Sequence, residues 1–407
     1  MAYLSRITES LIRSRSGGMI AALAFSTLAT GLLQISLPLE LRQLRASPSE
    51  IGFTLAMFGF GMFAFEWLWG VVADRIGYRA PLIASQLLYA VTIVVLSRVQ
   101  SVPMIAAGYF LACGMMVAVG PIGRSYLGTA LHAHLRATGL ALLASQWVIA
   151  AAIGAGVGGP LIDRFPIRTV MLAGAVLPAV SALLVFAVFR GYERFDGSRP
   201  GEAGAQGSAE ARSDVRRVLA ITATLALLIQ VGLGGELALL PLLVTTRLHG
   251  SAGAAGAAML AVGLLGGLLL VPGGSASDRW GRRPTMIVGG VVCAAGYLVY
   301  ALGGSFAMVL AGAAVRALGA ALIWPAATAW IAESMPRPRH AFYMGLFGEF
   351  ENIGITAGPI IGGFIWSAAG IQAAFYAYAA AALVASAVAA LTVAGRARRT
   401  AAIPIVP

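Results

Sequence analysis

The sequence contains no lysine, and all 28 of its basic residues are arginine. It has only two cysteines, Cys113 and Cys293, and only 11% of its residues are charged. Two thiols in different apolar runs give neither a disulfide framework nor a metal-ligand spacing, and we expect no metal and no cofactor. Charge this scarce, beside 59% hydrophobic residues, excludes a water-soluble domain of 407 residues.

Motifs of the common enzyme classes are also missing. We find no H-E-x-x-H, no phosphate-binding loop and no G-x-S-x-G with triad partners, so we expect no catalytic residue and no enzyme activity. A nucleic-acid binder would cluster its basic residues on one soluble surface, and this sequence, with a net charge of +12, predicts no such surface. The net charge favours contact with anionic membrane lipid over contact with nucleic acid.

What the sequence does contain is a series of long apolar runs, each able to cross a hydrocarbon core of roughly 30 Å. In lipid each run should be a helix, because every backbone N–H and C=O needs a partner within the segment. The fold class is therefore an all-α membrane protein. We predict twelve spans, 18–41, 49–72, 80–98, 103–124, 138–162, 168–190, 217–244, 252–273, 284–304, 306–332, 341–366 and 371–395.

The arginines orient these spans. With the N-terminus inside, the inner segments and span ends hold 21 arginines and the outer ones 6, while Arg316 alone lies in the interior of a span. This bias predicts a multi-pass protein of the cytoplasmic (inner) membrane with both termini cytoplasmic. We expect it to act as a monomer.

Two matching loops show that the chain is duplicated. Residues 70–79 read G-V-V-A-D-R-I-G-Y-R and residues 274–283 read G-S-A-S-D-R-W-G-R-R. Asp74 and Asp278 are 204 positions apart, as are Pro121 and Pro325. We predict a six-helix half at 1–190, a cytoplasmic linker at 191–216 and a second six-helix half at 217–407.

Two six-span halves, a long inner linker and G-x-x-x-D-R-x-G-x-R in both the second and the eighth inter-span loops resemble the major facilitator superfamily. The resemblance covers essentially the whole chain and is nearest to the drug:proton antiporter-like group with twelve spans. It implies two pseudo-symmetric six-helix bundles that work by alternating access. The first motif departs by having Tyr78 where a basic residue is usual.

The repeated loop is predicted to be a conformational latch. A carboxylate at a helix end can face the positive N-terminus of another helix. The resemblance implies that Asp74 faces the start of span 11, near Ala341, and that this contact breaks during the cycle. A plain positive-inside loop explains the arginines but not the spacing of Asp and Gly. The latch residues are Gly70, Asp74, Arg75, Gly77, Arg79, Gly274, Asp278, Arg279, Gly281, Arg282 and Arg283.

Span 11 carries G-I-T-A-G-P-I-I-G-G, which matches a family pattern that marks span 5 in drug:proton antiporters. The copy in span 5, from Ala150 to Gly159, lacks the first Gly and the Pro. Proton-coupled relatives also carry an Arg within span 4, where this chain has Ala112. The span 11 motif should bend and pack its helix. Its residues are Gly354, Gly358, Pro359, Gly362 and Gly363.

Four of the sixteen acids, Glu66, Glu236, Glu349 and Glu351, lie inside spans and away from the outer face. A charge at mid-bilayer costs about 2.5–3.5 kcal/mol, so each should face a cavity or a partner. Glu236 and Arg316 both lie roughly 12–15 Å from the outer surface at 1.5 Å per residue, and we predict that they pair. The pair is either a permanent salt bridge or one that is exchanged for substrate or proton.

Glu349 and Glu351 lie near the midplane and point about 200° apart, so one of them faces the cavity. Glu349 shares a face with Asn352, and we favour Glu349. An acid whose charge depends on which side the cavity faces is what proton coupling requires. Glu66 is near the inner interface, where snorkelling or support of the latch is an equal alternative. Glu236, Glu349, Arg316, Glu351 and Glu66 are thus the candidates for proton coupling.

Amides, aromatics and Met on the same spans would suit an amphipathic substrate, although ordinary helix packing explains each of them singly. The cavity candidates are Gln34, Tyr109, Met115, Gln146, Gln230, Trp324, Phe347 and Asn352. We therefore expect proton-coupled efflux of small amphipathic compounds. The alternatives are proton symport or facilitated uptake of a sugar or organic acid, movement of a lysolipid, and a membrane sensor or scaffold that transports nothing.

Overall fold

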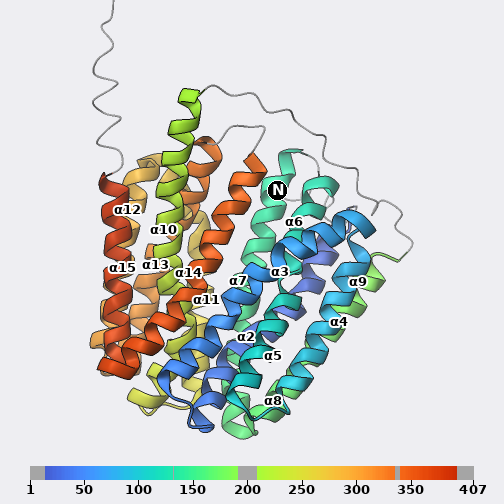
Figure 1. Cartoon of the computed structure of the whole chain (residues 1–407), viewed down its shortest axis with the longest axis vertical. Coiled ribbons are helices and arrows are strands. Elements are labelled where there is room, and N and C mark those ends of the chain that lie inside the picture. The colour runs from blue at the N-terminus through green and yellow to red at the C-terminus, as the bar shows by residue number, and fades with distance from the viewer. Residues whose placement is uncertain (1–13, 132, 191–208, 335–339, 392–407) are drawn as a thin grey trace, which may run out of the picture. The chain divides into compact units, whose positions relative to one another are not determined.

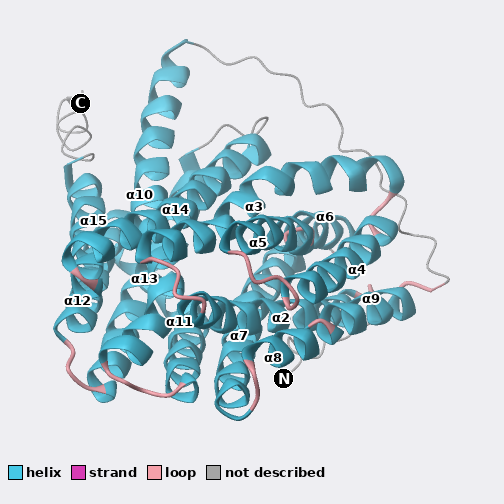
Figure 2. Ribbon diagram, turned by 60° about the horizontal axis from the view of Figure 1, so that its bottom comes forward, coloured by secondary structure: helices cyan, strands magenta, loops and turns pink. Residues whose placement is uncertain are grey.

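A computed structural model describes residues 14–131, 133–190, 209–334 and 340–391, and every regular element among them is a helix (Figure 2). The helices of the first half are α2 (Ser16–Gln43), α3 (Pro48–Ile76), α4 (Arg79–Leu96), α5 (Val102–Met116), α6 (Val119–Ala130), α7 (Ala133–Arg164), α8 (Ile167–Gly174) and α9 (Val176–Val188). The second half has α10 (Ala209–Leu242), the π-helix η2 (Leu243–Arg247), α11 (Ala252–Trp280), α12 (Arg282–Leu302), α13 (Phe306–Ser334), α14 (His340–Ala369) and α15 (Ile371–Leu391).

Among the described residues, twelve helical segments are long and apolar enough to cross a membrane, which confirms the predicted spans. Several of them are longer than the sequence indicated, among them the second and the eighth. α3 and α11 continue to Ile76 and Trp280, so both motif aspartates lie on the last turns of helices and not in loops. Each of these helices ends at a glycine with positive φ, Gly77 at 82° and Gly281 at 89°, a conformation that other residues rarely adopt.

Two predicted spans are interrupted at prolines. Span 4 divides into α5 and α6 at Val117 and Ala118, because the ring of Pro121 displaces the carbonyl of the residue four positions earlier. Span 6 divides after Gly174, four residues before Pro178, for the same reason. Pro325, the counterpart of Pro121, is accommodated within the continuous helix α13.

The chain divides into two compact units, Met1–Gly201 with Leu237–Gly267, and Glu202–Glu236 with Leu268–Pro407. The division by repeat, with halves at 1–190 and 217–407, stays a prediction. Residues 191–208 of the expected linker lie outside the described residues, and residues 209–216 belong to α10.

In the first unit α2 packs against α7 and α9, and α4 packs against α5 and α9 (Figure 1). One apolar cluster of this unit includes Leu23 of α2, Trp69 of α3, Tyr126 of α6 and Phe189 at the C-cap of α9. In the second unit α12 packs against α13 and α15, and a second apolar cluster includes Ile221, Ile331 and Phe347.

The repeat extends to backbone contacts. In both units a glycine on each of two helices allows the helices to approach until an added Cβ would collide with a carbonyl oxygen. The glycine and carbonyl pairs are Gly31 with Ala151 and Gly154 with Leu28 in the first unit, and Gly234 with Ile355 and Gly358 with Val231 in the second. Each position in the second set lies 203 or 204 residues after its counterpart. The contact between α2 and α7 is therefore repeated between α10 and α14.

Candidate functional site

A buried ion pair lies inside the second unit. Arg316 Nε on α13 is 2.7 Å from Glu236 Oε2 on α10, and the two side chains are 7% and 1% exposed. Tyr300 on α12 donates its hydroxyl proton to Glu236 Oε1 at 2.8 Å. The pairing expected from the depths of the two residues is thus present, and it ties three helices together.

Aromatic rings enclose this pair. Tyr300 packs against Phe375 with ring centroids 5.4 Å apart, and Tyr297 packs edge-on against Tyr378 at 5.9 Å. Cys293 Sγ lies 3.6 Å from the backbone oxygen of Arg316. Because Glu236 is 0% exposed, the pair is sealed from solvent and substrate in this conformation.

A second polar cluster of the same unit centres on Glu351 of α14. Its Oε1 accepts hydrogen bonds from Trp324 Nε1 on α13 at 2.7 Å and from Gln230 Nε2 on α10 at 3.1 Å. Trp324 is 38% exposed, whereas Gln230 is 8% exposed. Two predicted cavity residues therefore meet a predicted proton-coupling acid. The sequence favoured Glu349 for the cavity, and that preference stays a prediction.

Two further cavity candidates, Gln146 and Tyr109, contact residues of the first unit. Gln146 Nε2 donates to Thr27 Oγ1 at 3.0 Å, which joins α7 to α2. Tyr109 is buried and stacks on Phe58 with centroids 6.4 Å apart. The others are Gln34, Phe347 and Asn352, which are buried, and Met115 and Glu349, which are half-buried.

Glu66 pairs with Arg124, which joins α3 to α6 in the first unit. The side chains are 23% and 56% exposed. A pair this exposed satisfies the acid at modest energetic gain. Snorkelling, support of the latch and proton coupling by Glu66 all stay predictions.

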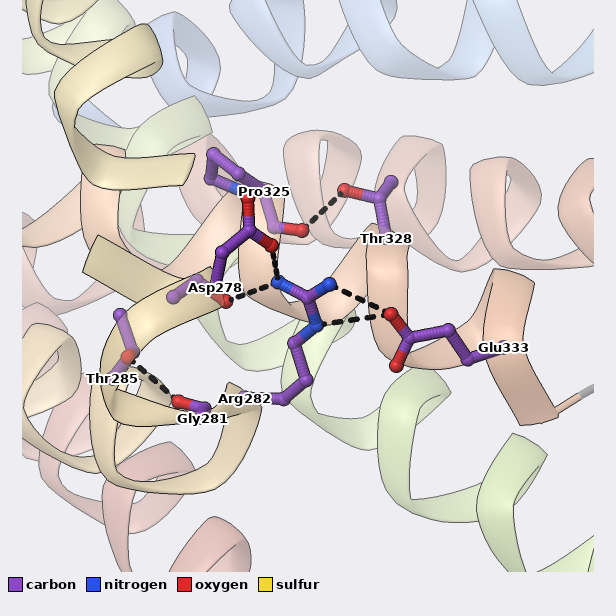
Figure 3. Close-up of polar contacts among 8 residues, drawn as sticks. Asp278, Gly281, Arg282, Thr285, Pro325, Thr328 and Glu333 are labelled. Atoms are coloured by element: carbon purple, nitrogen blue, oxygen red, sulfur yellow. Dashed lines mark hydrogen bonds and ion pairs between the residues drawn. The ribbon is translucent and has the colours of Figure 1, made fainter. Parts of the chain in front are cut away.

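The second copy of the repeated motif forms a compact polar cluster (Figure 3). Arg282 lies between two carboxylates, with Nη1 at 2.5 Å from Asp278 Oδ1 and Nη2 at 2.7 Å from Glu333 Oε1 of α13. The same Nη1 donates to Ser277 Oγ at 2.9 Å. Arg283 donates to the backbone oxygen of Ala390 on α15. The cluster therefore joins the ends of α11, α12, α13 and α15.

The first copy is built differently. Tyr78, at the position of Arg282, shares a hydrogen bond of 2.8 Å with Ser125 Oγ on α6. Arg79 lies over the ring of Phe186 on α9, 4.8 Å from its centroid. Asp74, Arg75 and Arg279 are exposed. An added Cβ at Gly70 would meet no atom within 4 Å, and one at Gly274 would lie 3.8 Å from Pro325 Cβ. The expected partner of Asp74 near Ala341 lies outside the described side chains, so that contact stays a prediction.

The motif of span 11 lies within α14, which is continuous across Pro359. Gly354 and Gly358 are the positions of closest approach to α10. Tyr378 of α15 donates its hydroxyl to the carbonyl of Gly358 at 2.9 Å. Gly362 and Gly363 are buried. The close-packing role expected of these glycines is therefore seen at Gly354 and Gly358.

Two contacts of acids near the predicted outer surface were missed at the sequence level. Glu40 of α2 pairs with Arg168 Nε of α8 at 2.6 Å and is 7% exposed. Asp163, at the end of α7, accepts hydrogen bonds from the backbone N–H groups of Ala252 and Gly253. The pair of Glu40 and Arg168 could have been found, because the sequence places both residues on the outer side. The bonds of Asp163 could not, because backbone N–H groups donate them and residue types do not reveal such donors.

No group of three His, Cys, Asp or Glu residues in the described part of the chain is placed to hold a metal ion.

The chain matches the family model described as Major Facilitator Superfamily over residues 19–247 and 222–404. It is 28% identical over 317 residues to the uncharacterized MFS-type transporter YuxJ of Bacillus subtilis. The aligned region covers 76% of this chain and 79% of YuxJ. It is 26% identical over 139 residues to the quinolone resistance protein NorA of Staphylococcus aureus. This aligned region covers 34% of this chain and 35% of NorA.

Solved structures share the fold at low identity. A bacterial homolog of the human lysosomal transporter Spinster, in an inward-facing and unoccupied conformation, has a TM-score of 0.79 at 12% identity, with 98% of this chain and 99% of that chain covered. The nucleoside transporter NupG has a TM-score of 0.71 at 14% identity, with 93% of this chain and 98% of that chain covered.

Proposed function

Because the chain belongs to the major facilitator superfamily and is therefore a multi-pass membrane transporter, we propose that it exports small amphipathic compounds across the cytoplasmic membrane in exchange for protons. The observation that carries this proposal is the cluster of Glu351, Trp324 and Gln230. Both termini lie in the cytoplasm in this proposal, in keeping with the distribution of arginines between the predicted loops.

Glu351 is the acid that we assign to proton exchange. It lies within a membrane span, where a permanent charge costs about 2.5–3.5 kcal/mol. Two of its donors, an indole and an amide, are neutral hydrogen-bonding groups. In this proposal the carboxylate takes up a proton or binds a cationic group of the substrate during the cycle.

The same cluster connects the charge of Glu351 to helix packing. Its donors come from α13 and α10, and a hydrogen bond to a charged acceptor is roughly twice as strong as one between neutral groups. Protonation therefore weakens the attachment of α14 to both neighbours. A carrier needs this dependence of packing on protonation if proton uptake is to favour one conformation.

Glu236 and Arg316 act as a brace in this proposal. Their pair is sealed by aromatic rings and joins three helices of one unit. The equivalent positions of the first half, Leu33 and Ala112, carry neither charge. A brace that holds α10 to α13 would support the two donors of Glu351, which are on the same two helices.

The amphipathic character of the substrate follows from the surface beside Glu351. Trp324 presents a partly exposed indole next to the carboxylate, which suits a compound with an aromatic ring and a basic group. NorA, the relative named for quinolone resistance, supports export as the direction.

The test is a flux assay in proteoliposomes with quinolone and ethidium as probes. An imposed pH gradient should drive transport by the wild type, and Glu351→Gln should exchange the probe at equal concentrations but not respond to the gradient. Glu50→Gln is the control, because Glu50 bonds only within its own helix start. A gradient response that survives in Glu351→Gln contradicts the assignment, and probe flux without any gradient response contradicts proton coupling.

A further inference from the structure

The N-terminus of α11 is capped by a side chain from another helix. The carboxylate of Asp163, at the end of α7, accepts hydrogen bonds from the N–H of Ala252 at 2.9 Å and from the N–H of Gly253 at 2.8 Å. Ser251 Oγ accepts a third from Ala254 at 3.1 Å. The first turn of a helix has no internal partners for these groups. α7 supplies two of the three.

The counterpart of α11 in the first half needs no such help. α3 begins with a capping box in which Ser47 and Glu50 bond each other's backbone N–H, and Pro48 has no N–H to satisfy. At an offset of 204, Ala252 replaces Pro48 and Ala254 replaces Glu50. α11 keeps the serine cap at Ser251 but lacks the Pro and the Glu, and Asp163 of the other repeat half bonds two of its N–H groups instead.

Small residues bring the two helices together below this cap. An added Cβ at Gly256 would lie 2.6 Å from the carbonyl oxygen of Ala155, and one at Gly156 would lie 3.0 Å from Leu260 Cβ. These contacts lie within the first unit, which includes Leu237–Gly267 although this segment belongs to the second repeat half by sequence. The end of α10 and the start of α11 therefore pack with the first half of the chain.

We propose that Asp163 and the N-terminus of α11 form an outer latch that closes the carrier toward the outside and opens in each transport cycle. The glycines allow a close but separable contact, and the carboxylate gains from the helix dipole only while α11 stays docked. Asp163 is exposed, so water can replace α11 as its partner when the latch opens. The proposal requires the alternating access of the proposed function but not proton coupling.

The first experiment measures access from outside. Cys113→Ala and Cys293→Ala give a cysteine-free chain, and Gln34→Cys places a reporter on α2, about 13 Å from the end of that helix. Asp163→Asn should raise labelling of this cysteine by a membrane-impermeant maleimide about two- to fivefold. Glu50→Gln, an acid that caps its own helix, should leave labelling unchanged. Unchanged labelling in Asp163→Asn overturns the latch.

The second experiment closes the latch covalently. An added Cβ at Gly253 lies 2.6 Å from Asp163 Oδ2, so Asp163→Cys with Gly253→Cys brings two thiols within reach of a disulfide. Oxidation should reduce labelling of the reporter at least tenfold, and a reductant should restore it. An oxidised carrier that labels at the reduced rate overturns the proposal. Labelling uses neither substrate nor gradient, so it can succeed even where the proton-exchange assay fails.

Discussion

The brace formed by Glu236 and Arg316 gives the sharpest energetic prediction. Arg316→Met leaves an acid that is 0% exposed without its cation, and Glu236→Gln leaves a buried guanidinium without its anion. Breaking a buried pair from one side costs about 3–5 kcal/mol, whereas replacing both partners is often nearly neutral. Gln at 236 retains an acceptor for the hydroxyl of Tyr300. The double variant should therefore be within about 1–2 kcal/mol of the wild type.

The assay is a double-mutant cycle measured by denaturant unfolding in detergent, with tryptophan fluorescence as the signal. We expect a coupling energy of at least about 3 kcal/mol between the two positions. The double variant should also keep gradient-driven transport. If the losses of the single variants simply add, the two residues do not form a brace. If the double variant is stable but ignores the gradient, the pair takes part in proton coupling and the assignment to Glu351 is incomplete.

Tyr300→Phe removes the hydroxyl donor of Glu236 and should lower the free energy of unfolding by about 1–2 kcal/mol in the same assay, with no change in gradient response. Arg282→Ala should cost no more than about 1 kcal/mol, since Glu333 is 55% exposed, and its effect on thermal unfolding should shrink in high salt. An effect that is large and independent of salt would show a stronger role for this cluster. Gly154→Leu should prevent folded protein from accumulating, because its Cβ would meet the backbone of α2, and a monodisperse variant in size-exclusion chromatography would contradict that packing.

Most of the fold could be predicted because apolar length and repetition survive in the sequence. The offset between Asp74 and Asp278 predicts a duplicated chain, and the glycine contacts of α2 with α7 recur at an offset of 203 or 204 residues between α10 and α14. The ends of helices were predicted less well than their positions. We placed the ends of the second and eighth spans where the apolar run stops, but a helix can continue through polar residues outside the membrane, and α3 and α11 continue through the motif aspartates.

The sites were predictable only where depth decides the partner. Glu236 and Arg316 lie at equal depth on different helices, and their pairing followed from that. The choice between Glu349 and Glu351 depends on the rotation of α14 about its axis, which periodicity alone does not determine, and the preference for Glu349 stays a prediction. The bonds of Asp163 were missed because their donors are backbone groups 89 and 90 residues away.

The most direct test of the account follows protons and substrate together. Proteoliposomes loaded with a pH-sensitive dye receive ethidium on one side, and internal pH and ethidium flux are recorded at the same time. Proton-coupled export predicts that protons move opposite to ethidium in the wild type, and that Glu351→Gln carries ethidium with no accompanying change in pH. Ethidium flux by the wild type without proton movement would contradict the central claim.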